Sequence, residues 1–252
     1  MPGLRAIFTY HSIDDSRSAI SVAPLVFEEH VRWLSQGTVR VTSLERLLAL
    51  DPHDPGDAVA LTFDDGFANF MTAAALLEAH GLAATLFVVS GHVGGTNAWR
   101  GRSHRGIPTL PLLTWSNLEH LSLRGFAIGA HTRTHPSLPG LAPAEVEDEM
   151  DRCVSELGGR LGVAPLSFAY PYGALDDRVA ASAAARFSVA VTADFDTVRT
   201  DSPRHRLPRL DMYYFRDPGA LARWNTRGFA RRLRWIAARR RLRRAITAGE
   251  SA

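Results

Sequence analysis

Short apolar runs alternate with longer segments of helical periodicity along most of this chain, and this alternation is the feature that most constrains its fold. The runs suit buried strands, whereas the segments between them place apolar residues three and four positions apart, as an amphipathic helix does. Strands are predicted at 5–10, 58–63, 84–89, 126–130, 166–170 and 187–191, and helices at 27–35, 44–50, 67–80, 115–123, 144–161 and 174–186. Strands that alternate with helices form parallel βα units, so we expect an α/β fold, as a barrel or an open sheet.

The composition favours one large domain without covalent crosslinks. The chain has 252 residues, 46% of them hydrophobic, which is enough to bury a substantial core. Cys153 is the single cysteine, so no intrachain disulfide can form, and its spacing from Met150 and Leu157 predicts that it packs in the core. All 29 basic residues are arginine, which excludes lysine Schiff-base chemistry and a P-loop.

The positive charge is concentrated near the C-terminus. Nine arginines and no acidic residue lie between Arg227 and Arg244. We therefore divide the chain into a main domain at 1–225 and a basic helix or tail at 226–252. This tail is interpreted as a solvated helix packed across the main domain, as a helix that contacts an anionic membrane surface, or as a nucleic-acid contact, which we favour least.

The N-terminal segment carries only a short apolar run that ends at His11, without the features of a signal peptide. No stretch approaches the 18 apolar residues of a membrane span either. We therefore expect a cytoplasmic protein, peripheral to the inner membrane face if the arginine segment contacts lipid.

Two adjacent carboxylates, Asp64 and Asp65, follow the buried strand at 58–63. Neither can point into the core unpaired without a large cost, and neighbouring residues of an extended chain face different ways. Asp65 is predicted to bind a metal and Asp64 to act as a general base towards water. The alternative is that Asp-Asp-Gly at 64–66 is a simple turn.

His131 and His135 follow a second strand end at a spacing of four, which on one helical turn brings both imidazoles to the same side. Two imidazoles and one carboxylate suit catalytic Zn²⁺ and other divalent transition metals. The alternative is a chance pair with Thr132 and Thr134 as helix caps.

Together these two motifs resemble those of the polysaccharide deacetylase (NodB-homology) family, carbohydrate esterase family 4. Residues 62–66 (Thr-Phe-Asp-Asp-Gly) match its first motif and residues 131–135 (His-Thr-Arg-Thr-His) its second. The resemblance extends from about residue 4 to 215. It implies that residues 1–225 form a distorted (β/α) barrel, that Asp65, His131 and His135 are metal ligands, and that the reaction removes N- or O-acetyl groups from sugars.

The third motif of the family resembles residues 168–173 (Phe-Ala-Tyr-Pro-Tyr-Gly), but with a departure. The resemblance implies that the amide of Tyr172 helps to hold the oxyanion of the transition state. The alternative is a proline turn after a strand. Ala169 stands where the family has the arginine that orients the base aspartate, and Arg209 is our candidate substitute.

The family's usual C-terminal Leu-x-His motif is absent, so the general acid must come from elsewhere. Tyr10 and His11 end the first strand and resemble the Tyr-His element of the branch that includes the poly-N-acetylglucosamine deacetylases. That resemblance implies that His11 protonates the leaving amine. The alternative is a capping or core histidine.

The predicted function is therefore metal-dependent hydrolysis of N-acetyl or O-acetyl groups on a carbohydrate, through attack of a metal-bound water. The cofactor is a divalent metal, Zn²⁺ first, with Co, Ni, Mn and Fe as alternatives. The substrate is an N-acetylated glycan or a lipid-linked sugar, and the loop at 90–111 is expected to shape its groove. The alternatives are a glycan-binding barrel with weakened catalysis and a hydrolase of a non-sugar amide or cyclic imide.

Overall fold

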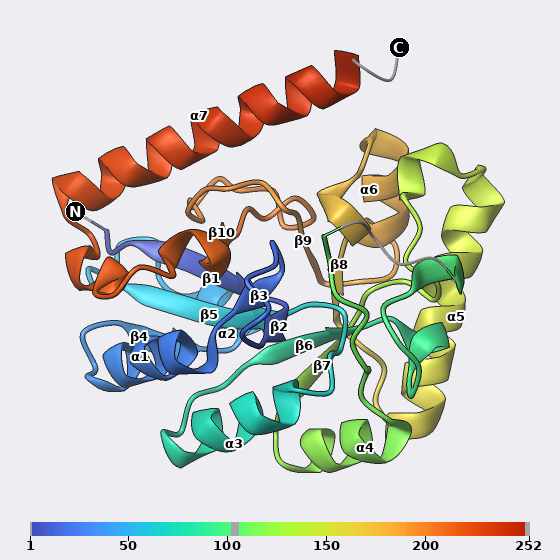
Figure 1. Cartoon of the computed structure of the whole chain (residues 1–252). Coiled ribbons are helices and arrows are strands. Elements are labelled where there is room, and N and C mark those ends of the chain that lie inside the picture. Colours follow the sequence, from blue (N-terminus) through green and yellow to red (C-terminus); the bar gives the residue numbers. More distant parts are fainter. Residues whose placement is uncertain (1, 102–105, 250–252) are drawn as a thin grey trace.

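In the computed structural model, which describes residues 2–101 and 106–249, the centre of the molecule is a curled parallel sheet (Figure 1). Its strands lie in the order β10-β1-β5-β6-β7-β8-β9, and β4 pairs with β5 beside this path. Their bounds are β1 Arg5–Tyr10, β4 Arg40–Thr42, β5 Ala58–Phe63, β6 Thr85–Val88, β7 Ala127–Ala130, β8 Ser167–Ala169, β9 Val189–Val191 and β10 Leu210–Asp211. The expected α/β fold with a parallel sheet is confirmed.

The central strands are buried on both faces. Every residue of β1 and of β5 is buried, which explains why both read as continuous apolar runs and not as alternating patterns. The two strands pair in register along their whole length, from Arg5 with Ala58 to Tyr10 with Phe63. Their carboxyl ends therefore lie side by side, and the residues that follow them, His11 and Asp64, emerge at one edge of the sheet.

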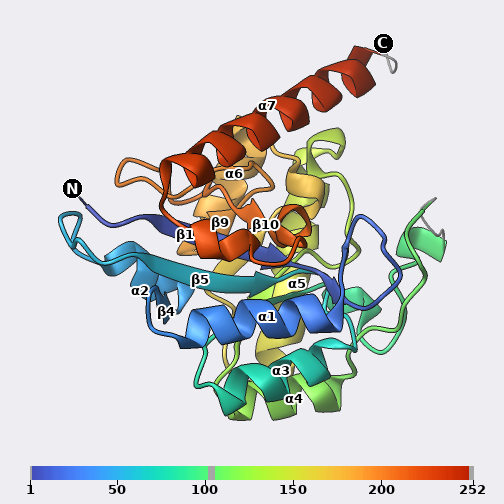
Figure 2. The same cartoon turned by 60° about the vertical axis from the view of Figure 1, so that its left-hand side comes forward.

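Helices cover the sheet on its outside. Figure 2 shows α1, α3 and α4 on one side of β5 and α7 on the other, above β1 and β10. The α-helices are α1 Pro24–Ser35, α2 Leu44–Ala49, α3 Phe70–Ala79, α4 Trp115–Leu123, α5 Pro143–Leu161, α6 Asp177–Ala184 and α7 Arg227–Gly249. Short 3-10 helices lie at Ser90–His92, Trp99–Gly101, Leu138–Gly140, Pro171–Gly173, Met212–Phe215 and Ala220–Arg223.

Local signals set several of these boundaries. Ser43 accepts a hydrogen bond from the amide of Arg46, and Thr114 forms a capping box with Asn117, so these two residues cap the starts of α2 and α4. The helix predicted at 67–80 begins only at Phe70, because the buried Phe67 pairs with Leu112 in an isolated bridge. The short strands β2 (Ser12–Ile13), β3 (Ser21–Val22) and β4 lack a periodic pattern and were not expected.

A buried polar contact fixes the end of β1. The ring of Tyr10 stacks on Phe63 at 5.0 Å, and its hydroxyl lies 3.1 Å from Nδ1 of His30. Nε2 of His30 lies 3.0 Å from the carbonyl of Phe215, which can only accept, so Nε2 carries the proton and Nδ1 accepts from Tyr10. Burial lowers the pKa of His30 to about 4, which keeps this neutral arrangement. The strand that leads to His11 is thereby anchored to α1.

The buried side of α7 belongs to the same core as the sheet. Phe229, Leu233 and Ile236 are buried in the main hydrophobic cluster, together with Phe8 of β1 and Phe215. The helix therefore packs across the main domain, and the predicted division at residue 226 separates segments that share one core. No helix in the described part of the chain combines the length and apolarity needed to cross a membrane.

Cys153 lies in the interior of α5, as expected. It is fully buried, and its thiol lies 3.7 Å from the carbonyl of Val88. Burial raises the pKa of this thiol to about 11, so it remains protonated at neutral pH and does not act as a nucleophile.

Candidate active site

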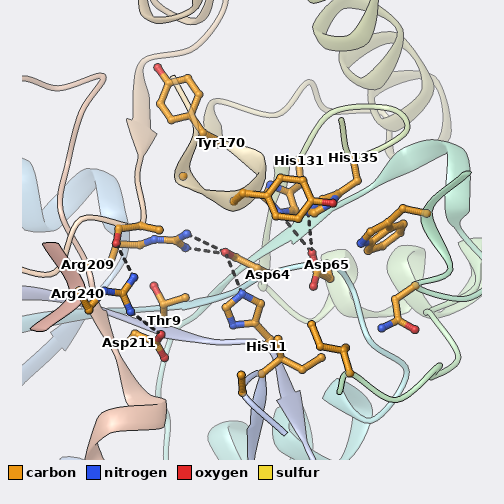
Figure 3. Close-up of a pocket in the computed structure, with 18 residues that line it drawn as sticks. Thr9, His11, Asp64, Asp65, His131, His135, Tyr170, Arg209, Asp211 and Arg240 are labelled. Carbon is orange, nitrogen blue, oxygen red and sulfur yellow. Dashed lines mark hydrogen bonds and ion pairs between the residues drawn. The ribbon is translucent and has the colours of Figure 1, made fainter. Parts of the chain in front are cut away.

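The carboxyl ends of the strands surround one pocket, and every residue that the sequence singled out lines it (Figure 3). Asp64 and Asp65 follow β5, His131 and His135 follow β7, and His11 follows β1. The pocket also contains Tyr172, from the turn after β8, and Arg209, which immediately precedes β10. In an α/β fold this edge of the sheet is the usual place for a binding or catalytic site.

The two adjacent aspartates point in different directions because of the backbone at Asp65. Its φ of 71° lies in the left-handed region, which aspartate tolerates better than most residues, and Gly66 follows with φ of 77°. This turn carries Asp65 towards the two histidines, while Asp64 faces Arg209. We expected an extended backbone to turn the two side chains apart. They do face different ways, but the cause is this left-handed turn and not an extended backbone.

Arg209 forms a buried bidentate ion pair with Asp64. Nη1 donates to Oδ1 and Nη2 to Oδ2, each at 2.7 Å, and both side chains are less than 5% exposed. Burial alone would raise the pKa of Asp64, but the charge and hydrogen bonds of Arg209 outweigh it and hold that pKa below its ordinary value. Asp64 is therefore a carboxylate that can accept a proton.

Asp65, His131 and His135 form a cluster with metal-ligand geometry. Nε2 of each histidine lies 3.4 Å from Oδ1 of Asp65, and the three ligand atoms lie within 4.8 Å of one another. Ligand bonds of about 2.1 Å in a tetrahedral site give edges of about 3.4 Å. The residues therefore fit a divalent cation such as Zn²⁺.

The surroundings of His131 orient it as a ligand. Its Nδ1 lies 2.7 Å from the carbonyl of Ala169, which can only accept, so Nδ1 carries a proton and Nε2 faces Asp65. Burial would raise the pKa of Asp65, but its interactions with the imidazoles of His131 and His135 hold that pKa well below its ordinary value. Ala169 thus contributes its backbone at the position where the family has an arginine side chain.

The segment that carries the two histidines is a loop, so the expected helical turn was wrong. Thr132 and His135 have φ of 64° and 60°, which no α-helix contains. The hydroxyl of Thr132 accepts from the amide of His135 at 3.0 Å, and Glu149 of α5 accepts from the amides of Arg133 and Thr134 at 2.9 and 2.8 Å. These side chains accept hydrogen bonds from backbone amides of the loop, which in a helix would donate to backbone carbonyls instead.

His11 and Tyr172 contact different residues of the site. Nε2 of His11 is 3.8 Å from Oδ2 of Asp64, and its side chain is 27% exposed, so it meets both the carboxylate and the pocket. Tyr172 has φ of 59° within the 3-10 turn, and its ring contacts that of His135 edge-on at 4.6 Å. His205, the last histidine in the chain, instead donates to the carbonyl of Phe187 at 2.8 Å.

Several residues that line the pocket were not predicted as site residues. Among them, Trp99 stacks on His135 with ring centroids 4.6 Å apart, which makes the 90–111 loop a wall of the pocket as expected, although residues 102–105 of that loop lie outside the described residues. Asp211 and Arg240, which also line the pocket, form an ion pair at 3.2 Å. No sequence signal separates Arg240 from the other arginines around it.

The comparison with known families decides the classification. The profile described as polysaccharide deacetylase matches residues 51–189, more than half of the chain. The chain belongs to the polysaccharide deacetylase family. The matched segment includes Asp64, Asp65 and both histidines, whereas His11 and Arg209 lie outside it.

Relatives and solved structures agree with this classification. YxkH of Bacillus subtilis (strain 168), provisionally named a polysaccharide deacetylase, is 26% identical over 214 residues, which cover 83% of this chain and 71% of YxkH. The deacetylase PplD of Streptococcus pyogenes, solved with acetate, superposes with a TM-score of 0.71 at 22% identity over 84% of this chain and 93% of PplD. IcaB from Ammonifex degensii gives 0.69 at 22% identity over 83% and 92%. The predicted fold of NodB-homology type is confirmed.

Removing a ligand of the cluster should remove the metal. We expect purified Asp65→Ala and His131→Ala to hold less than a tenth of the zinc of the wild-type chain, because the two remaining ligands bind a divalent cation weakly. Elemental analysis after dialysis against zinc measures this. Asp64→Asn is the matched control, since it changes the neighbouring carboxylate and should retain the metal. Full occupancy in either ligand variant would contradict the assignment.

Proposed function

We propose that this chain is a metal-dependent hydrolase that removes N-acetyl groups from a glycan. The observation that carries the proposal is the position of Asp64, a buried carboxylate that contacts Arg209 and His11 and directly precedes the Asp65 cluster. A base, a candidate acid and a metal-ligand set thus share one pocket. Membership of the polysaccharide deacetylase family supports the carbohydrate substrate.

Asp65, His131 and His135 would hold the cation through one carboxylate oxygen and two Nε2 atoms. When bound, a divalent cation supplies Lewis acidity that polarises the acetyl carbonyl and lowers the pKa of water. We propose Zn²⁺ because this donor set is typical of catalytic zinc, while Co, Ni, Mn and Fe suit the same ligands.

The protein's own groups account for the protons. Hydrolysis joins a water oxygen to the acetyl carbon and breaks the bond between that carbon and nitrogen. Asp64 accepts a proton from the water, since Arg209 keeps it ionised, and His11 gives a proton to the leaving nitrogen. The products are acetate and the free amine of the sugar.

The remaining walls of the pocket suit a sugar ring. Trp99 and Ile20 offer apolar surface, while His11 offers a polar group. We propose that the amide of Tyr172 donates to the oxyanion of the transition state. The left-handed backbone at Tyr172 turns the 3-10 segment at this side of the pocket and supports that role.

Acetate release from a chitooligosaccharide tests the proposal. We expect the zinc- or cobalt-loaded chain to release acetate, and Asp64→Asn to lose this activity while it retains the metal. His11→Ala should lower turnover by about 10²- to 10⁴-fold, again with the metal retained, because it removes the proton donor for the leaving nitrogen. His53→Ala is the control, since His53 is exposed and does not line the pocket.

The same assay distinguishes the competing functions. Binding of the oligosaccharide without acetate release would indicate a glycan-binding barrel. Hydrolysis of a cyclic imide but of no acetylated sugar would instead indicate a non-sugar amidase. Wild-type turnover in His11→Ala would refute the role of His11.

We further propose that α7 attaches the enzyme to an anionic lipid surface. We define the outer face of α7 by its exposed residues Arg227, Arg231, Arg234, Trp235, Arg239, Arg241 and Leu242. No acidic residue lies between 218 and 249, and Trp235 is 59% exposed beneath the guanidinium of Arg239 at 4.5 Å. Charge complementarity favours anionic headgroups, and an exposed tryptophan suits the membrane interface.

Vesicle co-sedimentation of the full chain tests this attachment. We expect the variant with Arg231→Gln, Arg234→Gln and Arg241→Gln to bind phosphatidylglycerol vesicles about 10²-fold more weakly than the wild type, since each arginine contributes about 1 kcal/mol at such a surface. Phosphatidylcholine vesicles, which lack net charge, are the control and should bind neither protein. Equal binding by both proteins would contradict the proposal.

A further inference from the structure

Two of the described arginine side chains of α7, Arg232 and Arg240, do not lie on the outer face. Arg240 leaves the helix on the side of the pocket, and its side chain is 20% exposed (Figure 3). Its guanidinium lies 5.4 Å from the ring of Tyr214 and 5.8 Å from that of Phe195. The side chain is thus packed between aromatic rings with its charged end at the pocket wall.

Arg240 connects the two ends of the curled sheet. Nη2 donates to the carbonyl of Ala193, which follows β9, and Nη1 donates to Oδ2 of Asp211 in β10, at 2.9 and 3.2 Å. β9 and β10 are the first and last strands of the sheet order, so these two acceptors lie on opposite ends of the sheet. We use the word seam for the two chain segments that Arg240 joins, which are residues 192–194 after β9 and residues 209–211 at β10.

The seam holds Arg209, the partner of Asp64. Nε of Arg209 donates to the carbonyl of Thr192, and its amide donates to the carbonyl of Asp194, both at 2.8 Å. Ala193 lies between these two acceptors, and Asp211 lies two residues beyond Arg209. The segments that Arg240 joins are therefore the same segments that fix the backbone and guanidinium of Arg209.

Ala193 also touches the turn that carries Tyr172. A Cβ atom at Gly173 would lie 2.5 Å from the amide nitrogen of Ala193, so only glycine permits this approach. A shift of Ala193 would therefore disturb two walls of the pocket together, the Arg209 side and the Tyr172 side.

We propose that Arg240 is a positioning residue for the deacetylation reaction. By crosslinking the seam, it fixes Arg209 and through it the orientation of the Asp64 carboxylate. This inference rests on the proposed function of Asp64 as the base, and it makes α7 part of the catalytic unit. Reaction rates are sensitive to such support, because a displacement of about 1 Å in a reacting group can cost about 10²-fold.

The contacts of Arg240 distinguish positioning from substrate binding. Its two terminal nitrogens already donate to protein acceptors, and Asp211 neutralises its charge. Loss of a positioning residue lowers kcat with little change in KM, whereas loss of a substrate contact raises KM.

The kinetic test compares Arg240→Met with Arg46→Met. Methionine keeps an apolar stem against Tyr214 and Phe195 but removes both hydrogen bonds, and Arg46 is an exposed arginine of α2 that does not line the pocket. We expect Arg240→Met to lower kcat about 10- to 100-fold with KM within about twofold and zinc content unchanged. Arg46→Met should match the wild type. A raised KM with unchanged kcat, or wild-type kinetics, would overturn the proposal.

Chemical rescue separates positioning from a general loss of folding. In Arg240→Ala, millimolar guanidinium ion should restore part of kcat, because it can occupy the space between Ala193 and Asp211. It should not restore Arg240→Met, whose side chain fills that space. An unfolded variant would not respond, and absence of rescue in a folded Arg240→Ala would count against the proposal.

A measurement without substrate keeps this inference distinct from the proposed function. The NMR signal of the Nε–H of Arg209, assigned by its loss in Arg209→Lys, should shift or broaden in Arg240→Met and not in Arg46→Met. If the wild-type chain releases no acetate, the proposed function fails, yet this signal still reports whether Arg240 positions Arg209. An unchanged signal would overturn the positioning role.

Discussion

The buried ion pair between Arg209 and Asp64 is the interaction on which the rest of the site depends. Two charges less than 5% exposed carry a large desolvation cost, which only a complete set of hydrogen bonds offsets. Both carboxylate oxygens of Asp64 accept from Arg209, and Arg209 also donates to Thr192 and Thr62. The pair joins the end of β5 to the segment before β10, and Arg209 also donates to the segment after β9, so the residue that joins the two ends of the sheet also keeps the candidate base ionised.

The candidate metal ligands Asp65, His131 and His135 lie at the same edge of the sheet, but a different set of contacts holds them in place. Asp65 reaches the histidines through a left-handed turn, and the loop of His131 and His135 is held by the carboxylate of Glu149 and the hydroxyl of Thr132. These polar supports replace the regular hydrogen bonds of a helix. Asp64 and Asp65 can therefore be consecutive residues and still face different partners.

The sequence predicted the parts of this structure that depend on local pattern. The strands at 5–10 and 58–63 were predicted to the residue, because each is a short and mostly apolar run that polar residues follow directly. The conformation at 131–135 was missed, since left-handed threonine and histidine follow from contacts with α5 that lie far along the chain. Arg209 was named from a missing arginine at Ala169, whereas Arg240 gave no signal, because only the docking of α7 separates it from its neighbours.

A double-mutant cycle on Asp64 and Arg209 tests the central claim most directly. Unfolding free energies of the wild type, Asp64→Asn, Arg209→Met and the double variant would be measured in urea, which leaves ionic strength unchanged, after removal of metal by chelation. We predict that Arg209→Met alone costs about 3–5 kcal/mol, because it leaves a buried unpaired carboxylate. We also predict that the double variant is at least about 2 kcal/mol more stable than the sum of the single changes implies. Effects that add to within about 0.5 kcal/mol would contradict the account.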